Sequence, residues 1–169
     1  MQVDTATFFL KAFDRYTEDL LTTFSRFDKR TFNLSPGEGR WSPGQMMQHL
    51  RKAERGTLRL MQGPVVVVEG RPAMSMEEKL SDLVHTRQRL EAPERLRPTE
   101  EVYAPMEMLE EIADQRADIR VSFEFAPNIA AEVQAWEHPR VGIMTICEWL
   151  YFTAVHGERH RRQYVDFAV

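Results

Sequence analysis

Apolar residues recur at intervals of three and four along several segments of this chain, which is the period of a helix with one buried face. In the first segment, residues 6–27, the recurring positions are mostly aromatic: Phe9, Phe13, Tyr16, Leu20, Phe24 and Phe27. The same period continues after Ser42, Ser75, Pro105 and Thr145. The pattern predicts a protein built from four or five helices.

Three of these segments begin with a capping box, in which the side chains of a Ser or Thr and of a Glu or Gln three residues later bind each other's backbone amides. The boxes are Ser42 to Gln45, Ser75 to Glu78 and Thr145 to Glu148. They predict a helix over residues 43–62, a helix from Ser75 that Pro93 breaks, and a last helix after Thr145. A further helix is expected from Pro105 to about Ser122, although residues 121–125 also alternate as a strand would.

The segments between these helices contain proline and glycine, which predict turns and loops. Residues 28–41 are expected to be a loop or a loosely wound connection, and residues 65–72 form a linker too short to found a sheet. Residues 126–142 are ambiguous, with a short helix around 129–135 as one interpretation. With no strand pair expected, the sequence predicts an all-α antiparallel four-helix bundle in a single domain over residues 1–169.

Composition and charge exclude several classes of protein. The longest apolar run, residues 65–68, is far below the roughly 18 residues that a membrane span needs, so no membrane partner is expected. A net charge of −4 argues against a nucleic-acid-binding protein, which needs clustered positive charge. The single cysteine cannot form an internal disulfide, and the first residues lack a secretory signal, so we expect a cytoplasmic protein.

Histidines provide the candidate chemistry. His156 and His160 are four residues apart and therefore differ by only about 40° around a helix, so their imidazoles can share one metal ion. The spacing alone also fits a solvated helix face. His49, between Met46 and Ala53, also lies on the inward face of its helix. Because a buried imidazole needs a partner, three inward histidines on two helices favour a shared divalent metal.

Other metal sites fit the sequence less well. Residues 156–160 lack the glutamate at the second position of the zincin HExxH motif, and the Glu-x-x-His pairs of a di-iron bundle are absent. Cys147 falls on the opposite side of its helix from His156 and is not expected to be a ligand. His85 is expected to be solvated. His138, which precedes a proline, is expected to be structural or to support a ligand rather than to bind metal.

Three segments of the chain start at Trp41, His138 and His156 and read WSPGQMMQHL, HPRVGIMTICEWL and HGERHRRQ. Together they resemble segments of one known family, the DinB/YfiT-like metal-binding four-helix bundles. These segments are similar to the family's W-S/T-P…H-L helix start, its H-P-x-x-G-x-L/M-S/T motif and its H-x-x-x-H-x-x-Q ending. Residues 63–125 match no motif of the family, and we expect substrate choice to depend on them.

The resemblance implies a metal triad of His49, His156 and His160, usually with Zn or Ni, in an up-down-down-up bundle that often forms a homodimer. Relatives in the family include S-transferases that use a low-molecular-weight thiol such as bacillithiol or mycothiol, and a thiol-dependent maleylpyruvate isomerase. We expect the Gln163 side chain to support the metal site, and the alternative is that this side chain is solvated. No catalytic residue beyond the ligands is assigned.

Three neutral imidazoles leave coordination positions open, and a thiol bound to a divalent metal loses its proton readily. The leading hypothesis is therefore a metal-dependent thiol S-transferase or hydrolase-like enzyme that acts on a small electrophile. One alternative is a non-catalytic metal-binding stress or detoxification protein, and another is a helical interaction module without metal. Arg159, Arg161 and Arg162 are too few to indicate DNA binding, and we expect them to face solvent or an anionic group of a substrate.

Overall fold

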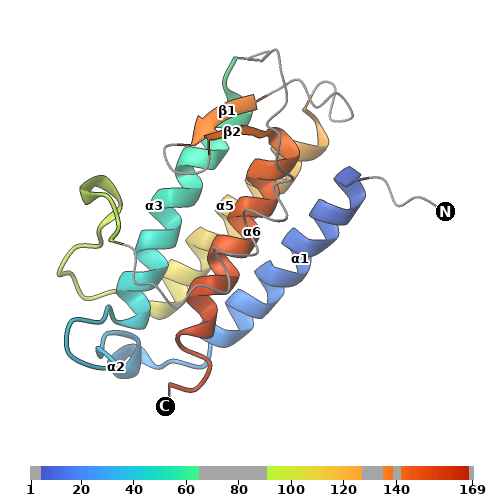
Figure 1. The fold of residues 1–169 in the computed structure, drawn as a ribbon. Coiled ribbons are helices and arrows are strands. Elements are labelled where there is room, and N and C mark those ends of the chain that lie inside the picture. Colours follow the sequence, from blue (N-terminus) through green and yellow to red (C-terminus); the bar gives the residue numbers. More distant parts are fainter. Residues whose placement is uncertain (1–4, 65–90, 127–134, 139–141, 168–169) are drawn as a thin grey trace.

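Four long helices lie side by side in the computed structural model, which describes residues 5–64, 91–126, 135–138 and 142–167 (Figure 1). The elements are α1 (Thr5–Phe24), α2 (Lys29–Phe32), α3 (Pro43–Gln62), the 3-10 helix η1 (Glu94–Leu96), α5 (Pro105–Glu124), β1 (Ala135–His138), β2 (Gly142–Thr145) and α6 (Ile146–Arg162). The expected all-α fold class is confirmed. The linker over residues 65–72 and the helix expected from Ser75 lie outside the described residues.

Capping boxes begin two of the long helices, as the sequence predicts. At α3, the hydroxyl of Ser42 accepts from the Gln45 amide at 3.2 Å, and the Gln45 side chain accepts from the Ser42 amide at 3.0 Å. Thr145 and Glu148 form the same pair at the start of α6. The predicted bounds of α3 are confirmed, and α5 continues to Glu124, so the alternating residues 121–124 are helical.

Two short elements differ from the sequence-based expectation. Residues 28–41, expected to form a loop or a loosely wound connection, contain the four-residue helix α2, whose start is capped by the Asp28 carboxylate. The absence of a strand pair was also wrong, because β1 and β2 pair antiparallel with Ala135 opposite Thr145. Strands of four residues give too few positions for an alternating pattern. Their stability depends on pairing with each other and on packing of β2, where Met144 is fully buried, against the bundle.

Contacts between side chains define the directions of the helices. Asp14 of α1 accepts from Arg120 of α5, and Thr17 accepts from Arg116, so these two helices run in opposite directions. Figure 1 shows α6 running the same way as α1, while α3 and α5 run the other way. The hairpin lies at one end of the bundle and α2 at the other.

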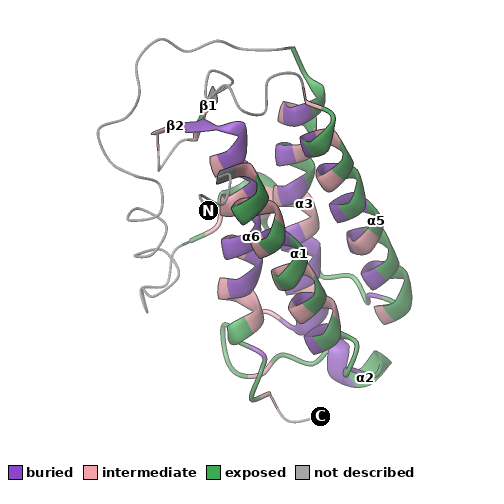
Figure 2. Cartoon of the chain, turned by 90° about the vertical axis from the view of Figure 1, so that its right-hand side faces the viewer, coloured by how far each residue is buried: buried purple, intermediate pink, exposed green. Residues whose placement is uncertain are grey.

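The buried interior has two apolar clusters with polar residues between them. One cluster is nearer the hairpin and includes Phe13, Ile119 and Met144, and the other is nearer α2 and includes Leu50 and Ile112. Figure 2 shows buried and exposed faces alternating along the helices, with the buried faces turned inward. Between the clusters, each long helix contributes polar or small residues, which we call the polar layer: Thr17, Glu54, Arg116, His156 and Gly157.

Candidate metal centre

Three histidines from two helices converge at the polar layer, of which His156 is a part. His49 of α3 faces His156 and His160 of α6, and each offers a ring nitrogen within 4.8 Å of the other two. The ring centroids are 5.3 Å apart for His49 and His156, 5.1 Å for His49 and His160, and 4.6 Å for His156 and His160. The structure thus brings together the three histidines singled out in the sequence.

Local structure positions each of these rings. His49 lies about two turns into α3, whose start is fixed by the Ser42 capping box. His156 and His160 share a face of α6 because they are one turn apart. A buried contact of 3.2 Å between the hydroxyls of Thr57 and Thr153 joins α3 to α6 one turn before His156.

Hydrogen bonds at the other ring nitrogens set the orientation of the imidazoles. Nδ1 of His49 lies 2.9 Å from the carbonyl oxygen of Leu96 in η1. Because a carbonyl can only accept, Nδ1 carries the proton and Nε2 keeps a lone pair. The Gln163 amide lies 3.2 Å from Nδ1 of His160, and its oxygen can accept from that nitrogen after a half-turn of the amide. The role of Leu96 could not be predicted from the sequence, because its contact uses a backbone carbonyl, which every residue type has.

The three imidazoles are held in the neutral form. Burial lowers the pKa of His156 to about 3 and lowers the pKa values of His160 and His49 as well. Nearby cations add to this effect: Lys52 lowers the pKa of His49, and Arg159 lowers those of His156 and His160. At neutral pH the ring nitrogens that face one another can therefore act as metal ligands.

The geometry and the donor set fit a first-row divalent metal. Nε2 of His156 and Nε2 of His160 are 3.1 Å apart. Two ligands bound at about 2.0 to 2.1 Å in tetrahedral geometry would be about 3.4 Å apart. Neutral imidazoles suit Zn, Ni, Cu and Fe. Among the described residues, this group of possible ligands contains no carboxylate or thiolate.

The other residues considered as candidates lie elsewhere. Cys147 is buried in the apolar cluster near the hairpin. His138, at the end of β1, packs its ring against Phe152 at 4.8 Å, and Phe152 stacks on His156 at 5.6 Å with an interplanar angle of 9°. An aromatic ring therefore separates His138 from the triad. His85 lies outside the described residues.

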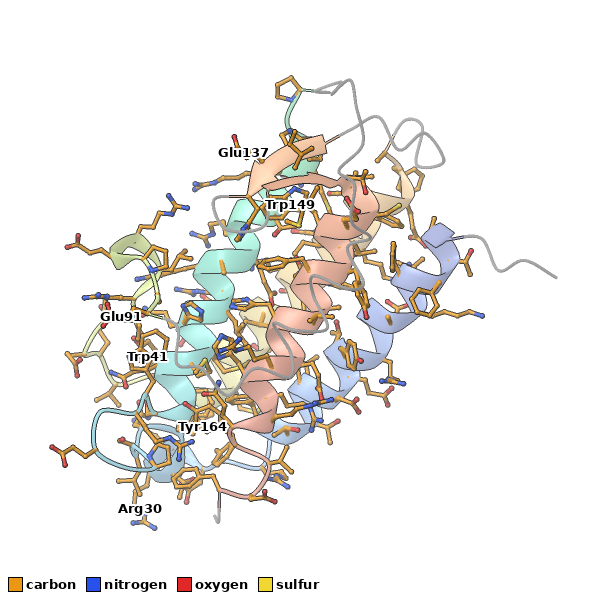
Figure 3. All side chains as sticks on the ribbon, viewed as in Figure 1. Arg30, Trp41, Glu91, Glu137, Trp149 and Tyr164 are labelled. Atoms are coloured by element: carbon orange, nitrogen blue, oxygen red, sulfur yellow. The ribbon has the colours of Figure 1, made fainter. Side chains whose placement is uncertain are left out.

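Aromatic side chains flank the triad. Trp41, just before α3, packs against His49 with ring centroids 5.1 Å apart, and Phe152 stacks on His156 one turn away on the same helix, α6. Trp149 of α6 belongs to the apolar cluster near the hairpin, and its ring lies 5.5 Å from that of His138. In Figure 3 Trp41 lies beside the lower half of α3, and Trp149 lies close to the hairpin.

Arg161 and Arg162, near the C-terminal end of α6, bind mainly to a carboxylate of their own helix. Arg161 donates to Glu158 and to Thr23 of α1, and Arg162 also donates to Glu158. The Glu158 carboxylate, only 3% exposed, thus receives both guanidinium groups. These pairs stabilise the junction of α1 and α6 and reduce the net positive charge there.

Comparison with known proteins gives one match. A family model described as the DinB superfamily matches residues 12–164, a range that includes all three histidines and every helix from α2 to α6. The match confirms the resemblance inferred from the three sequence segments. No curated protein and no solved structure matches the chain. No described helix combines the length and the apolar character that crossing a membrane requires.

Proposed function

Because this chain belongs to the DinB superfamily, we propose that it binds one divalent transition metal through His49, His156 and His160. The observation that carries the proposal is the convergence of three neutral imidazoles from two helices, with His49 buried and His156 and His160 half-buried. Removing an imidazole nitrogen from water costs free energy unless the nitrogen has a bonding partner. One metal ion would be such a partner for all three rings. Zn and Ni are the metals we propose first, since both accept imidazole ligands.

We propose further that the protein is a thiol S-transferase, or a hydrolase-like enzyme, acting on a small electrophile. Three protein ligands leave a coordination position open, as in catalytic rather than structural sites. A divalent metal held there would lower the pKa of a coordinated thiol into the neutral range. The chain's own contribution is to orient the ligands: Leu96 fixes the tautomer of His49, and Gln163 supports His160.

The half-buried rings of Trp41 and Phe152 define the sides of this site. They limit the access of water to the three histidines and offer flat apolar surfaces to a substrate. Such surfaces favour an electrophile with an apolar or aromatic part. A cytoplasmic location and a homodimer remain predictions, and sedimentation of the purified protein measures the oligomeric state.

Metal content tests the first part of the proposal. Protein purified without chelator is expected to contain one metal per chain by elemental analysis, or to take up one Zn or Ni per chain by calorimetry at pH 7.5. His156→Ala should abolish uptake. His138→Ala is the matched control, because it removes an imidazole near the site that is not among the three candidate ligands. A wild-type protein that neither contains nor binds metal would contradict the proposal.

Thiol addition separates an enzyme from a passive metal-binding protein. With Co in place of the native metal, a small thiol should produce a thiolate-to-Co charge-transfer band, and a chlorinated aromatic electrophile should be consumed faster than with thiol alone. A Co spectrum that no thiol changes, together with no acceleration, would leave the alternative of a non-catalytic metal-binding protein.

A further inference from the structure

A fully buried ion pair lies in the polar layer. Arg116 of α5 donates from Nε and Nη2 to the carboxylate of Glu54 on α3, with donor–acceptor distances of 2.6 to 3.2 Å. Both side chains are only 1% exposed. Charged pairs in such surroundings add little net stability compared with apolar residues of similar volume. Stability alone therefore does not explain this pair.

Arg116 also contacts the two remaining long helices. Its Nη1 donates to Thr17 of α1 at 3.0 Å, and its guanidinium lies over the ring of Phe13 at 5.5 Å. On α6 it lies directly against Gly157. The guanidinium of this α5 residue thus touches the other three long helices at the level of the polar layer, and its hydrogen bonds to Glu54 and Thr17 hold it in place.

Gly157 is the position on α6 that makes room for Arg116. A Cβ atom added there would lie 2.4 Å from Nη2 of Arg116, which no real contact allows. A second helical glycine, Gly56 on α3, would place its Cβ in open space, with no atom within 4 Å. The lack of a side chain is therefore a steric requirement at Gly157 and not at Gly56.

Gly157 directly follows His156 and lies within one turn of His160. These histidines face α3, while Gly157 faces α5. A helix backbone is stiff over one turn. The distance between Gly157 and the Arg116 guanidinium therefore also determines how far His156 and His160 lie from His49. Glu54, five residues after His49, fixes Arg116 relative to the same helix that carries His49.

We propose that Arg116, held by Glu54 and packed against Gly157, is a positioning residue that sets the separation of α3 and α6. This separation brings the three histidines together. The effect of Arg116 on metal affinity rests on the proposed metal binding. Its effect on the separation of the histidine rings does not depend on a bound metal.

The contact distances give the size of the expected effect. Moving a Cβ at residue 157 from 2.4 Å to an ordinary contact of 3.4 Å from Arg116 requires a shift of 1 Å. Metal–ligand distances tolerate only about 0.2 Å. A shift of this size should therefore weaken metal binding by roughly 10- to 100-fold, the range seen when groups that orient metal ligands are changed.

The first experiment compares Gly157→Ala with Gly56→Ala. Both variants exchange a helical glycine for alanine, but only the first meets Arg116. We expect Gly157→Ala to bind Zn and Co about 10- to 100-fold more weakly, to show an altered Co visible spectrum, and to have larger His49–His156 ring separations in a crystal structure. Gly56→Ala should match the wild type in all three. Equal affinities, spectra and ring positions in both variants would overturn the proposal.

A double variant, Glu54→Met with Arg116→Met, covers the case in which Gly157→Ala does not fold. Methionines fill similar volume without charge, so circular dichroism should show a folded helical protein. Their flexible side chains no longer fix the helix separation, and metal binding should weaken as in Gly157→Ala. Wild-type affinity and Co spectrum in this variant would overturn the proposal. If the wild type itself bound no metal, the proposed function would fail, while ring separations in the crystal structures would still decide the positioning role.

Discussion

Acid should destabilise the metal-free protein in a defined pH range, because the folded state keeps its three clustered histidines neutral. Burial lowers the pKa of His156 from the ordinary histidine value of about 6.5 to about 3. The unfolded chain therefore binds a proton at this residue between pH 6.5 and about 3, whereas the folded chain does not. Stability is fully present above pH 6.5 and falls as the pH is lowered through this range.

The size of the loss in stability follows from the pKa of the histidine in the unfolded chain. Between pH 7.5 and 5.5 an imidazole with a pKa of 6.5 in the unfolded chain, and one well below 5 in the folded chain, contributes a loss of about 1.4 kcal/mol. Burial also lowers the pKa values of His160 and His49, so these two groups add to the loss of stability in the same direction.

Urea unfolding in the presence of a chelator measures this loss at pH 7.5, 6.5 and 5.5. The variant His156→Asn removes one titrating group and keeps a polar side chain. Its free energy of unfolding should fall less than that of the wild type, by about 1.4 kcal/mol over the same range. Equal pH dependence in the two proteins, or a wild type whose stability is the same at pH 5.5 and 7.5, would refute the reasoning.

Other substitutions test the core, the ion pair and a helix start, all by urea unfolding. Trp149→Ala should cost about 3 to 5 kcal/mol as a large buried aromatic does, whereas His156→Ala should leave the metal-free fold cooperative; equal losses would make His156 a structural residue. Glu54→Ala should cost about 3 to 5 kcal/mol because Arg116 keeps a buried, unpaired charge, and a loss below 1 kcal/mol would contradict that account. Ser42→Ala should cost about 1 kcal/mol through loss of the α3 cap, and no change would show that the cap contributes nothing.

Much of the fold could be predicted from the sequence because its signals are local. A capping box is an interaction between residues three apart, so Ser42 and Thr145 reveal the starts of α3 and α6 without knowledge of the rest of the chain. The shared face of His156 and His160 follows in the same way from the helical period. That His49 points inward could also be predicted, since the apolar residues around it define the buried face of its helix.

The tertiary structure decided what depends on distant contacts. Strands β1 and β2 form because they pair with each other and pack on the bundle, which their eight residues do not encode as a pattern. The carbonyl of Leu96 fixes the tautomer of His49, but every residue has a carbonyl, so no residue type signals that role. Gly157 looks in the sequence like a weak position in a helix, and only the approach of Arg116 shows why a side chain cannot fit there. Periodicity and capping reach one or two turns along the chain, whereas the contacts that assemble this site join residues 40 to 60 or more positions apart.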